Sequence, residues 1–180
     1  MPAPFLEPAV QAPSLIQNVE QVLPIDQIFP TGALLLGGLS LIGVVLFHGL
    51  VMRWVQSHIV RQEPVLRRSP TTLRIDLLMA SVILALLGAA VTEVVIWTAV
   101  LKYARLLPSW AGAASYAASC YTTLGDASVR PPTGWGMLGP IIAISGLFTF
   151  GWSGSVLVNV VGRTSLARDA WHAARTPPVV

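Results

Sequence analysis

The feature that most constrains this chain is a set of three long apolar runs, each longer than the roughly 18 residues needed to cross about 30 Å of hydrocarbon. They extend from about Thr31 to Met52, from about Ile75 to Leu101 and from about Met137 to Val161. Of all residues, 54% are hydrophobic and only 11% are charged, which is outside the norm for soluble globular proteins. We therefore predict an all-α membrane protein with three transmembrane helices.

Charged residues outside the runs predict the orientation of the chain. Residues 1–30 contain acidic residues but no Lys or Arg. Within this segment, Ser14 and Gln17 form a capping-box pattern among apolar residues at helical spacing, which predicts a short amphipathic helix. Arg residues are frequent in segments 54–74 and 164–180. By the positive-inside rule these two segments lie in the cytoplasm and the N-terminus lies outside. The predicted parts are an extracytoplasmic segment 1–30, a first helix 31–53, a basic loop 54–74, a membrane domain 75–163 and a cytoplasmic tail 164–180.

The segment between the second and third runs predicts a short helix inside the membrane. Its middle, from Trp110 to Tyr121, is small and uncharged, and Pro108 and Ser109 are suitable residues to start a helix. The stretch that begins at Thr122 ends this helix. Irregular backbone at membrane depth is tolerated only where it is buried in protein or lines water. We therefore expect a re-entrant pore helix and a filter-like loop.

A family resemblance lies in this part of the chain. Tyr116 to Gly125 reads YAASCYTTLG, Trp135 follows, and Gly139 to Leu157 reads GPIIAISGLFTFGWSGSVL. This pattern resembles the pore module of bacterial two-span potassium channels and covers residues 75–163. The resemblance implies a homotetramer in the bacterial inner membrane, with the second span as outer helix and the third as pore-lining inner helix. The ion path that it implies consists of Thr122, Thr123, Leu124, Gly125 and Asp126, whose carbonyl oxygens replace the hydration shell of a K⁺ or Na⁺ ion.

The outer half of this filter departs from the family pattern. After TTLG the family continues Tyr-Gly-Asp, whereas this chain continues Asp126-Ala127-Ser128. In an ungapped alignment, Ala127 replaces a glycine with positive φ, which costs a residue with a Cβ about 1 kcal/mol or more. If Tyr-Gly is deleted instead, Asp126 is the outer aspartate and two carbonyl layers are lost. Both alignments predict weakened potassium selectivity.

Two residues of the second span are predicted to support the filter. Glu93 lies inside the span, where a carboxyl group costs about 2.5 to 3.5 kcal/mol on insertion scales and usually has a partner. We expect Glu93, together with Trp97, to support the back of the filter, and the alternative role of Glu93 is direct handling of ions or protons. His48, in the first span, is expected to be a packed or interfacial residue.

The third span contains three glycines, Gly146, Gly151 and Gly154. They allow inner helices to approach closely or to bend, and the more specific prediction is that they form a gating hinge.

Other classes of function have little support. Cys120 is the only cysteine, which excludes an intrachain disulfide and a cysteine-rich metal site. No His cluster or paired carboxylates share a helix face, so we expect no enzyme, no bound metal and no cofactor beyond the monovalent cations of a pore. The Arg residues flank apolar runs, which argues against nucleic acid as a partner. The predicted function is a cation channel subunit, and the alternative is a non-conducting accessory subunit that docks other membrane subunits.

Overall fold

The computed structural model describes residues 30–68, 71–125 and 128–175. Four helices lie in this part of the chain, and three of them are long and apolar enough to cross a membrane. Their bounds are Thr31–Arg68 (α3), Thr72–Tyr103 (α4), Trp110–Tyr121 (α5) and Leu138–Arg175 (α6). The three predicted long apolar helices and the short helix between the second and third are confirmed. The predicted N-terminal amphipathic helix and Asp126 lie outside the described residues.

The long helices extend beyond the apolar runs. Helix α3 continues to Arg68 through most of the predicted basic loop 54–74, so that only residues 69–71 separate it from α4. Helix α6 likewise continues to Arg175 through most of the predicted tail 164–180. Apolar run length measures only the part of a helix that crosses hydrocarbon, whereas Arg, Gln and Leu continue a helix well in water. Val55, beyond the predicted end of the first span, is buried against α4 and α6, which also stabilises the longer helix.

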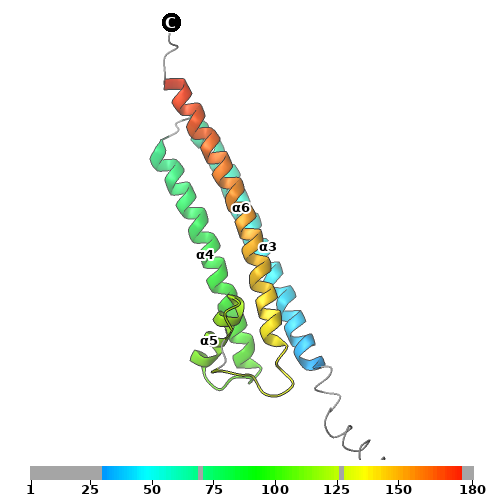
Figure 1. Ribbon diagram of the computed structural model, residues 1–180. Coiled ribbons are helices and arrows are strands. Elements are labelled where there is room, and N and C mark those ends of the chain that lie inside the picture. Colours follow the sequence, from blue (N-terminus) through cyan, green and yellow to red (C-terminus); the bar gives the residue numbers. More distant parts are fainter. Residues whose placement is uncertain (1–29, 69–70, 126–127, 176–180) are drawn as a thin grey trace, which may run out of the picture.

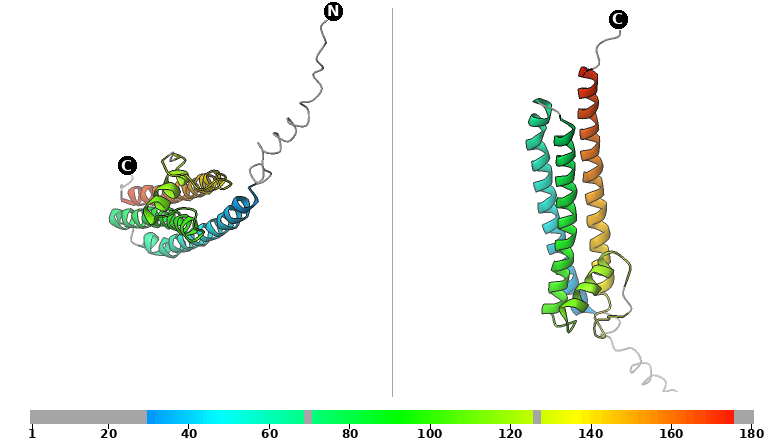
Figure 2. Two further views of the ribbon diagram at one scale, coloured as in Figure 1. Left: turned by 90° about the horizontal axis from the view of Figure 1, so that it is seen from below. Right: turned by 90° about the vertical axis from the view of Figure 1, so that its left-hand side faces the viewer.

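The three long helices form a bundle in which α3 and α6 run in the same direction and α4 runs in the opposite one (Figure 1). Helix α5 packs against both α4 and α6 at one end of this bundle (Figure 2). We call this the α5 end and the opposite one the far end. At the α5 end, Gly37 allows α3 to approach α6, because a Cβ there would lie 2.6 Å from the Ile141 side chain.

Two buried clusters hold the bundle together. The first, at the α5 end, joins all four helices and contains among others Val44, Trp97, Tyr121, Leu138 and Ile142. The second, which we call the far cluster, consists of Met52, Val55, Val82, Leu86, Val156 and Val160. Many large apolar side chains instead point outward, including Leu39, Leu50, Leu84, Leu87 and Val158. This outer surface suits contact with lipid, in which apolar side chains need not be buried by protein.

Met52→Ala tests the far cluster. Met52 is buried, and its truncation leaves a cavity that we expect to lower the free energy of unfolding by about 2 kcal/mol. Leu50→Ala, on the same helix but with a 64% exposed side chain, is the matched control and should be close to neutral. Thermal unfolding of the protein in mild detergent measures both. Equal losses of stability would contradict the observed packing.

Candidate functional site

A buried contact between two polar side chains joins α3 to α4. His48 of α3 and Glu93 of α4 are 1% and 0% exposed, and Nδ1 of His48 lies 2.7 Å from Oε1 of Glu93. The second ring nitrogen of His48 lies 3.5 Å from the hydroxyl of Ser153 on α6. A carboxyl group inside a membrane-spanning helix is expected to have a partner. The structure identifies that partner as His48, so this histidine is more than a packing residue.

Tyr121, the last residue of α5, extends this contact to the other two helices. Its hydroxyl group donates a hydrogen bond to Oε2 of Glu93 at 2.7 Å. The same hydroxyl lies 2.7 Å from the hydroxyl of Thr149 on α6, which is itself buried and bonded to the backbone of its own helix. Both oxygens of the Glu93 carboxyl group are therefore hydrogen-bonded. We call His48, Glu93, Tyr121 and Thr149 the central network.

Trp97 makes a second link between α4 and α6. Its indole N–H donates to the hydroxyl of Ser145 at 2.9 Å, and that hydroxyl donates to the carbonyl of Ile142. Trp97 and Ser145 are both fully buried. Trp97, predicted to support the filter, thus bonds to α6 one turn before Thr149.

Gly146 allows the end of α5 to press against α6. A Cβ at this position would overlap the backbone carbonyl of Tyr121. Backbone atoms cannot move aside as the tip of a flexible side chain can, so the contact requires glycine. At Gly151 and Gly154, in contrast, a Cβ would meet no described atom within 4 Å. Close packing thus accounts for Gly146, and the hinge at these three glycines stays a prediction.

The start of α5 is also held. Ser109 caps the helix, as predicted, by accepting a hydrogen bond from the N–H of Gly112. The Lys102 ammonium donates to the carbonyl of Pro108 at 2.6 Å, and the rings of Tyr103 and Trp110 meet edge to face. Helix α5 is therefore fixed to the end of α4 where it begins and to the central network where it ends.

These two attachment points give the depth that α5 reaches along α4. Trp110 contacts Tyr103, the last residue of α4, and Tyr121 bonds to Glu93. Glu93 lies ten residues before Tyr103, which corresponds to about 15 Å along a helix. The C-terminal end of α5 therefore lies well inside the length of the apolar helix α4, about level with His48.

The segment after α5 is exposed although it starts at this depth. Thr122, Thr123, Leu124 and Gly125 are all exposed, and Leu124 reaches 83%. The chain turns back over the end of α5, since the N–H groups of Thr123 and Gly125 donate to carbonyls of its last turn. Thr123 has a φ of 63°, a conformation that is unfavourable for a β-branched residue. Backbone strain of this kind often marks functional segments.

The predicted site residues that the structure describes fall into two separate groups. Glu93 and Trp97 lie in the buried contacts between helices, and Thr122 to Gly125 form one exposed turn. Asp126 and Ala127 lie outside the described residues, so both filter alignments stay predictions. The full hydrogen bonding and burial of Glu93 favour its positioning role over direct contact with ions.

Sequence reasoning missed the partners of Glu93, and the position of His48 becomes a signal only once the length of α3 is known. His48 lies 20 residues before Arg68, and Glu93 lies 21 residues after Thr72, at the start of α4. Two antiparallel helices with a short connection place such residues at the same depth. No feature of the sequence identifies Tyr121 and Thr149 as members of the central network, because hydroxyl groups are common in apolar helices.

Among the described residues, no group of three or more His, Cys, Asp or Glu side chains could hold a metal ion. Comparison of the chain with protein-family models, with curated proteins and with solved structures gave no match. The case for function therefore comes from the residues and their geometry.

Gly146→Ala tests the contact between α5 and α6. The added methyl group must displace the Tyr121 backbone, and we expect a loss of about 1 to 3 kcal/mol in stability, as for overpacking elsewhere. Gly151→Ala is the matched control on the same helix, and it should be neutral or stabilising by up to about 1 kcal/mol. Thermal unfolding in detergent compares the two. A stable Gly146→Ala protein would show that this approach is not required.

Tyr121→Phe tests the central network. Removal of the hydroxyl leaves buried polar atoms of Glu93 and Thr149 with one partner fewer, and we expect a loss of about 1 to 3 kcal/mol. Tyr103→Phe, at a 78% exposed position, is the control and should change stability little. Chemical unfolding followed by tryptophan fluorescence measures both variants. The network would have no energetic role if the two substitutions were equivalent.

Proposed function

We propose that the chain is a subunit of a tetrameric cation channel of the potassium-channel type. In this proposal α5 is a re-entrant pore helix, and the carbonyl and hydroxyl groups of Thr122 to Gly125, followed by Asp126, form the path for monovalent cations. The observation that carries the proposal is the exposed, irregular turn Thr122–Gly125, which begins about 15 Å along α4 from its end.

This turn is unsuitable for contact with lipid. Irregular backbone inside a bilayer must be buried in protein or face water, because hydrocarbon offers no hydrogen-bond partners. A ring of identical subunits meets this requirement, since the four turns then surround a shared aqueous path. The C-terminal end of α5 also carries a partial negative charge that favours a cation nearby.

One face of α6 is suited to line the rest of such a path. The turn lies beside the start of this helix, where Thr123 and Gly125 border a hollow of about 320 Å³ together with Ala143. From Ala143 the same face continues with exposed, uncharged residues at helical spacing. These are Leu147, Gly151, Gly154 and Val158. An uncharged lining of this kind matches the inner helix of a channel.

The central network has a clear purpose in this proposal. Carbonyl oxygens can replace an ion's hydration shell only if they are held in position. Glu93 of α4 and Thr149 of α6 hold Tyr121, the residue directly before the turn, and His48 of α3 holds Glu93. Because the outer half of the filter departs from the family pattern, we expect weak discrimination between K⁺ and Na⁺.

Single-channel recording tests the proposal. The purified protein is placed in a planar bilayer with KCl on one side and NaCl on the other, first as wild type and then as Leu124→Cys in a Cys120→Ala background. We expect unitary currents with a small reversal potential, and we expect a positively charged, membrane-impermeant thiol reagent to block Leu124→Cys because Leu124 lies on the path.

Leu87→Cys in the same background is the control, since Leu87 is exposed on α4 away from the turn. Its current should persist in the presence of the reagent. Block of both variants would argue against the turn as the ion path. A correctly folded tetramer or monomer that stays silent at all voltages would contradict conduction and favour an accessory subunit whose turn contacts another protein.

A further inference from the structure

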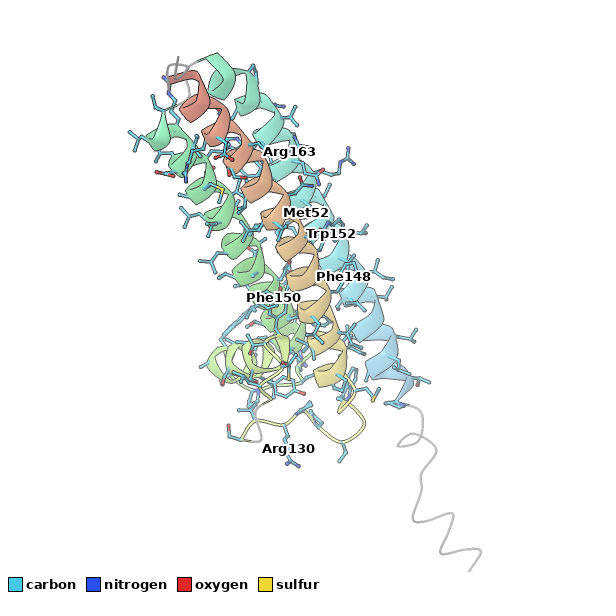
Figure 3. All side chains as sticks on the ribbon, turned by 45° about the horizontal axis from the view of Figure 1, so that its top comes forward. Met52, Arg130, Phe148, Phe150, Trp152 and Arg163 are labelled. Atoms are coloured by element: carbon cyan, nitrogen blue, oxygen red, sulfur yellow. The ribbon has the colours of Figure 1, made fainter. Side chains whose placement is uncertain are left out.

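The ring of His48 lies next to a groove between α3 and α6. The groove has a volume of about 300 Å³ and is lined by side chains of these two helices alone. Trp152 and Arg163 border it, and Figure 3 shows both along the side of α6 that is next to α3. The Trp152 ring also packs against the ring of His48, with the two centroids 5.4 Å apart. Trp152 therefore contacts the groove and the central network at once.

The groove is suited to hold water. Gln56, Ser155 and Asn159 contribute polar side chains to its lining, and a polar space of this volume holds several water molecules. The apolar runs of α3 and α6 end near Met52 and Val161, so Gln56 lies just beyond the hydrocarbon at the far end. We therefore expect water to enter the groove from the far end and to approach Trp152.

The contacts of the His48 ring come from three helices. Glu93 of α4 lies against Nδ1 at 2.7 Å, while Ser153 of α6 lies 3.5 Å from Nε2. Tyr121 of α5 reaches the ring only through the Glu93 carboxyl group. Trp152 and Ser153 carry no charge. Among the described residues that contact His48, Glu93 is therefore the one ionisable partner.

Other charged groups lie farther from the ring. On α3 the next charged residue is Arg53, five positions on, and its side chain is exposed. On α6, Arg163 lines the groove eleven residues after Trp152, which is about 16 Å along the helix. The charge on His48 is therefore set mainly against the charge on Glu93.

We propose that His48 and Glu93 form a proton-binding site inside the membrane, and that its loading loosens the hold on Tyr121. A proton from water in the groove binds Nε2 of His48, while Nδ1–H continues to donate to the Glu93 carboxylate. The loaded pair is neutral overall, whereas the empty pair carries one negative charge.

Histidine is a suitable residue for this purpose. In water its charge changes between about pH 5 and 8, and ionisable residues inside membrane spans commonly take part in proton binding. The surroundings of His48 accommodate the loaded form. The hydroxyl of Ser153 faces Nε2, and a cation within about 6 Å of an indole ring, here that of Trp152, is attracted by it.

Loading acts on Tyr121 through the carboxyl group that both residues share. The Tyr121 hydroxyl donates to Oε2 of Glu93, and a hydrogen bond to an ionised acceptor is strengthened by the charge of that acceptor. A protonated His48 ring offsets part of this charge and so weakens the bond. We therefore expect the turn Thr122–Gly125, which follows Tyr121 directly, to be more mobile when the site is loaded. The proposal does not depend on conduction, because it needs only these contacts.

Tryptophan fluorescence tests the site, because a protonated imidazole ring quenches the emission of an indole ring that it contacts. The full chain is reconstituted in phosphatidylcholine vesicles with His58→Gln and His172→Gln, which leave His48 as the only histidine. The emission that disappears in Trp152→Phe is the signal. We expect this signal to fall as the pH is lowered from about pH 8 to 5. It should be independent of pH after Glu93→Gln, because a lone positive charge inside hydrocarbon is too costly to form.

His58 provides the matched control on the same helix. Its ring stacks on that of Trp54 at a centroid distance of 5.7 Å, and Trp54 is 59% exposed. With His58 as the only histidine, the emission that disappears in Trp54→Phe should also fall at low pH, and Glu93→Gln should leave this response unchanged. A Trp152 signal that is independent of pH, or that depends on pH equally with and without the Glu93 carboxylate, would overturn the proposal.

A spin label at Leu124 tests the effect on the turn. Leu124→Cys in a Cys120→Ala background carries the label, and electron paramagnetic resonance measures its mobility. We expect greater mobility at about pH 5 than at about pH 8, and His48→Gln should remove this difference. Leu87→Cys, exposed on α4, is the control, and its label should not respond to pH. A label at Leu124 that does not respond, or that responds equally in His48→Gln, would overturn the link between the site and the turn.

Discussion

The buried carboxyl group of Glu93 is the constraint on which the arrangement of the helices depends. Inside a bilayer, apolar surfaces gain little by leaving lipid, so polar contacts and close packing decide how helices associate. Glu93 needs partners at its own depth, and it finds His48 on α3 and Tyr121 on α5. Tyr121 in turn reaches Thr149 on α6. One carboxyl group therefore fixes the positions of three neighbouring helices around α4.

This arrangement links α3 to the segment that we propose as the ion path. Tyr121 directly precedes the exposed turn, and its backbone rests on Gly146 while its hydroxyl is held by the central network. Helix α3 thus belongs to the support of the turn through His48 and is more than a peripheral attachment.

Part of this architecture could be predicted from local signals. The bounds of α5 follow from Ser109, which caps its start, and from the end of the small-residue segment at Tyr121. The need of Glu93 for a partner follows from its place in an apolar run. The lengths of α3 and α6 could not be predicted in the same way, because hydropathy indicates only where the apolar part of a helix ends. A helix continues past that point wherever its residues favour helical structure or are buried against a neighbouring helix, as Val55 is.

By itself, the sequence determined the number of long apolar helices, the short helix between the last two and the presence of a carboxyl group that requires a partner. These properties depend on composition and spacing along the chain, which any reader of the sequence can measure. Only the tertiary structure decided that the partner is His48, 45 positions away, that Tyr121 joins them, and that Gly146 lies under a backbone carbonyl. Such contacts depend on how each helix is rotated and shifted against its neighbours, and this is set by the packing of all the helices together and not by the pattern within any one of them.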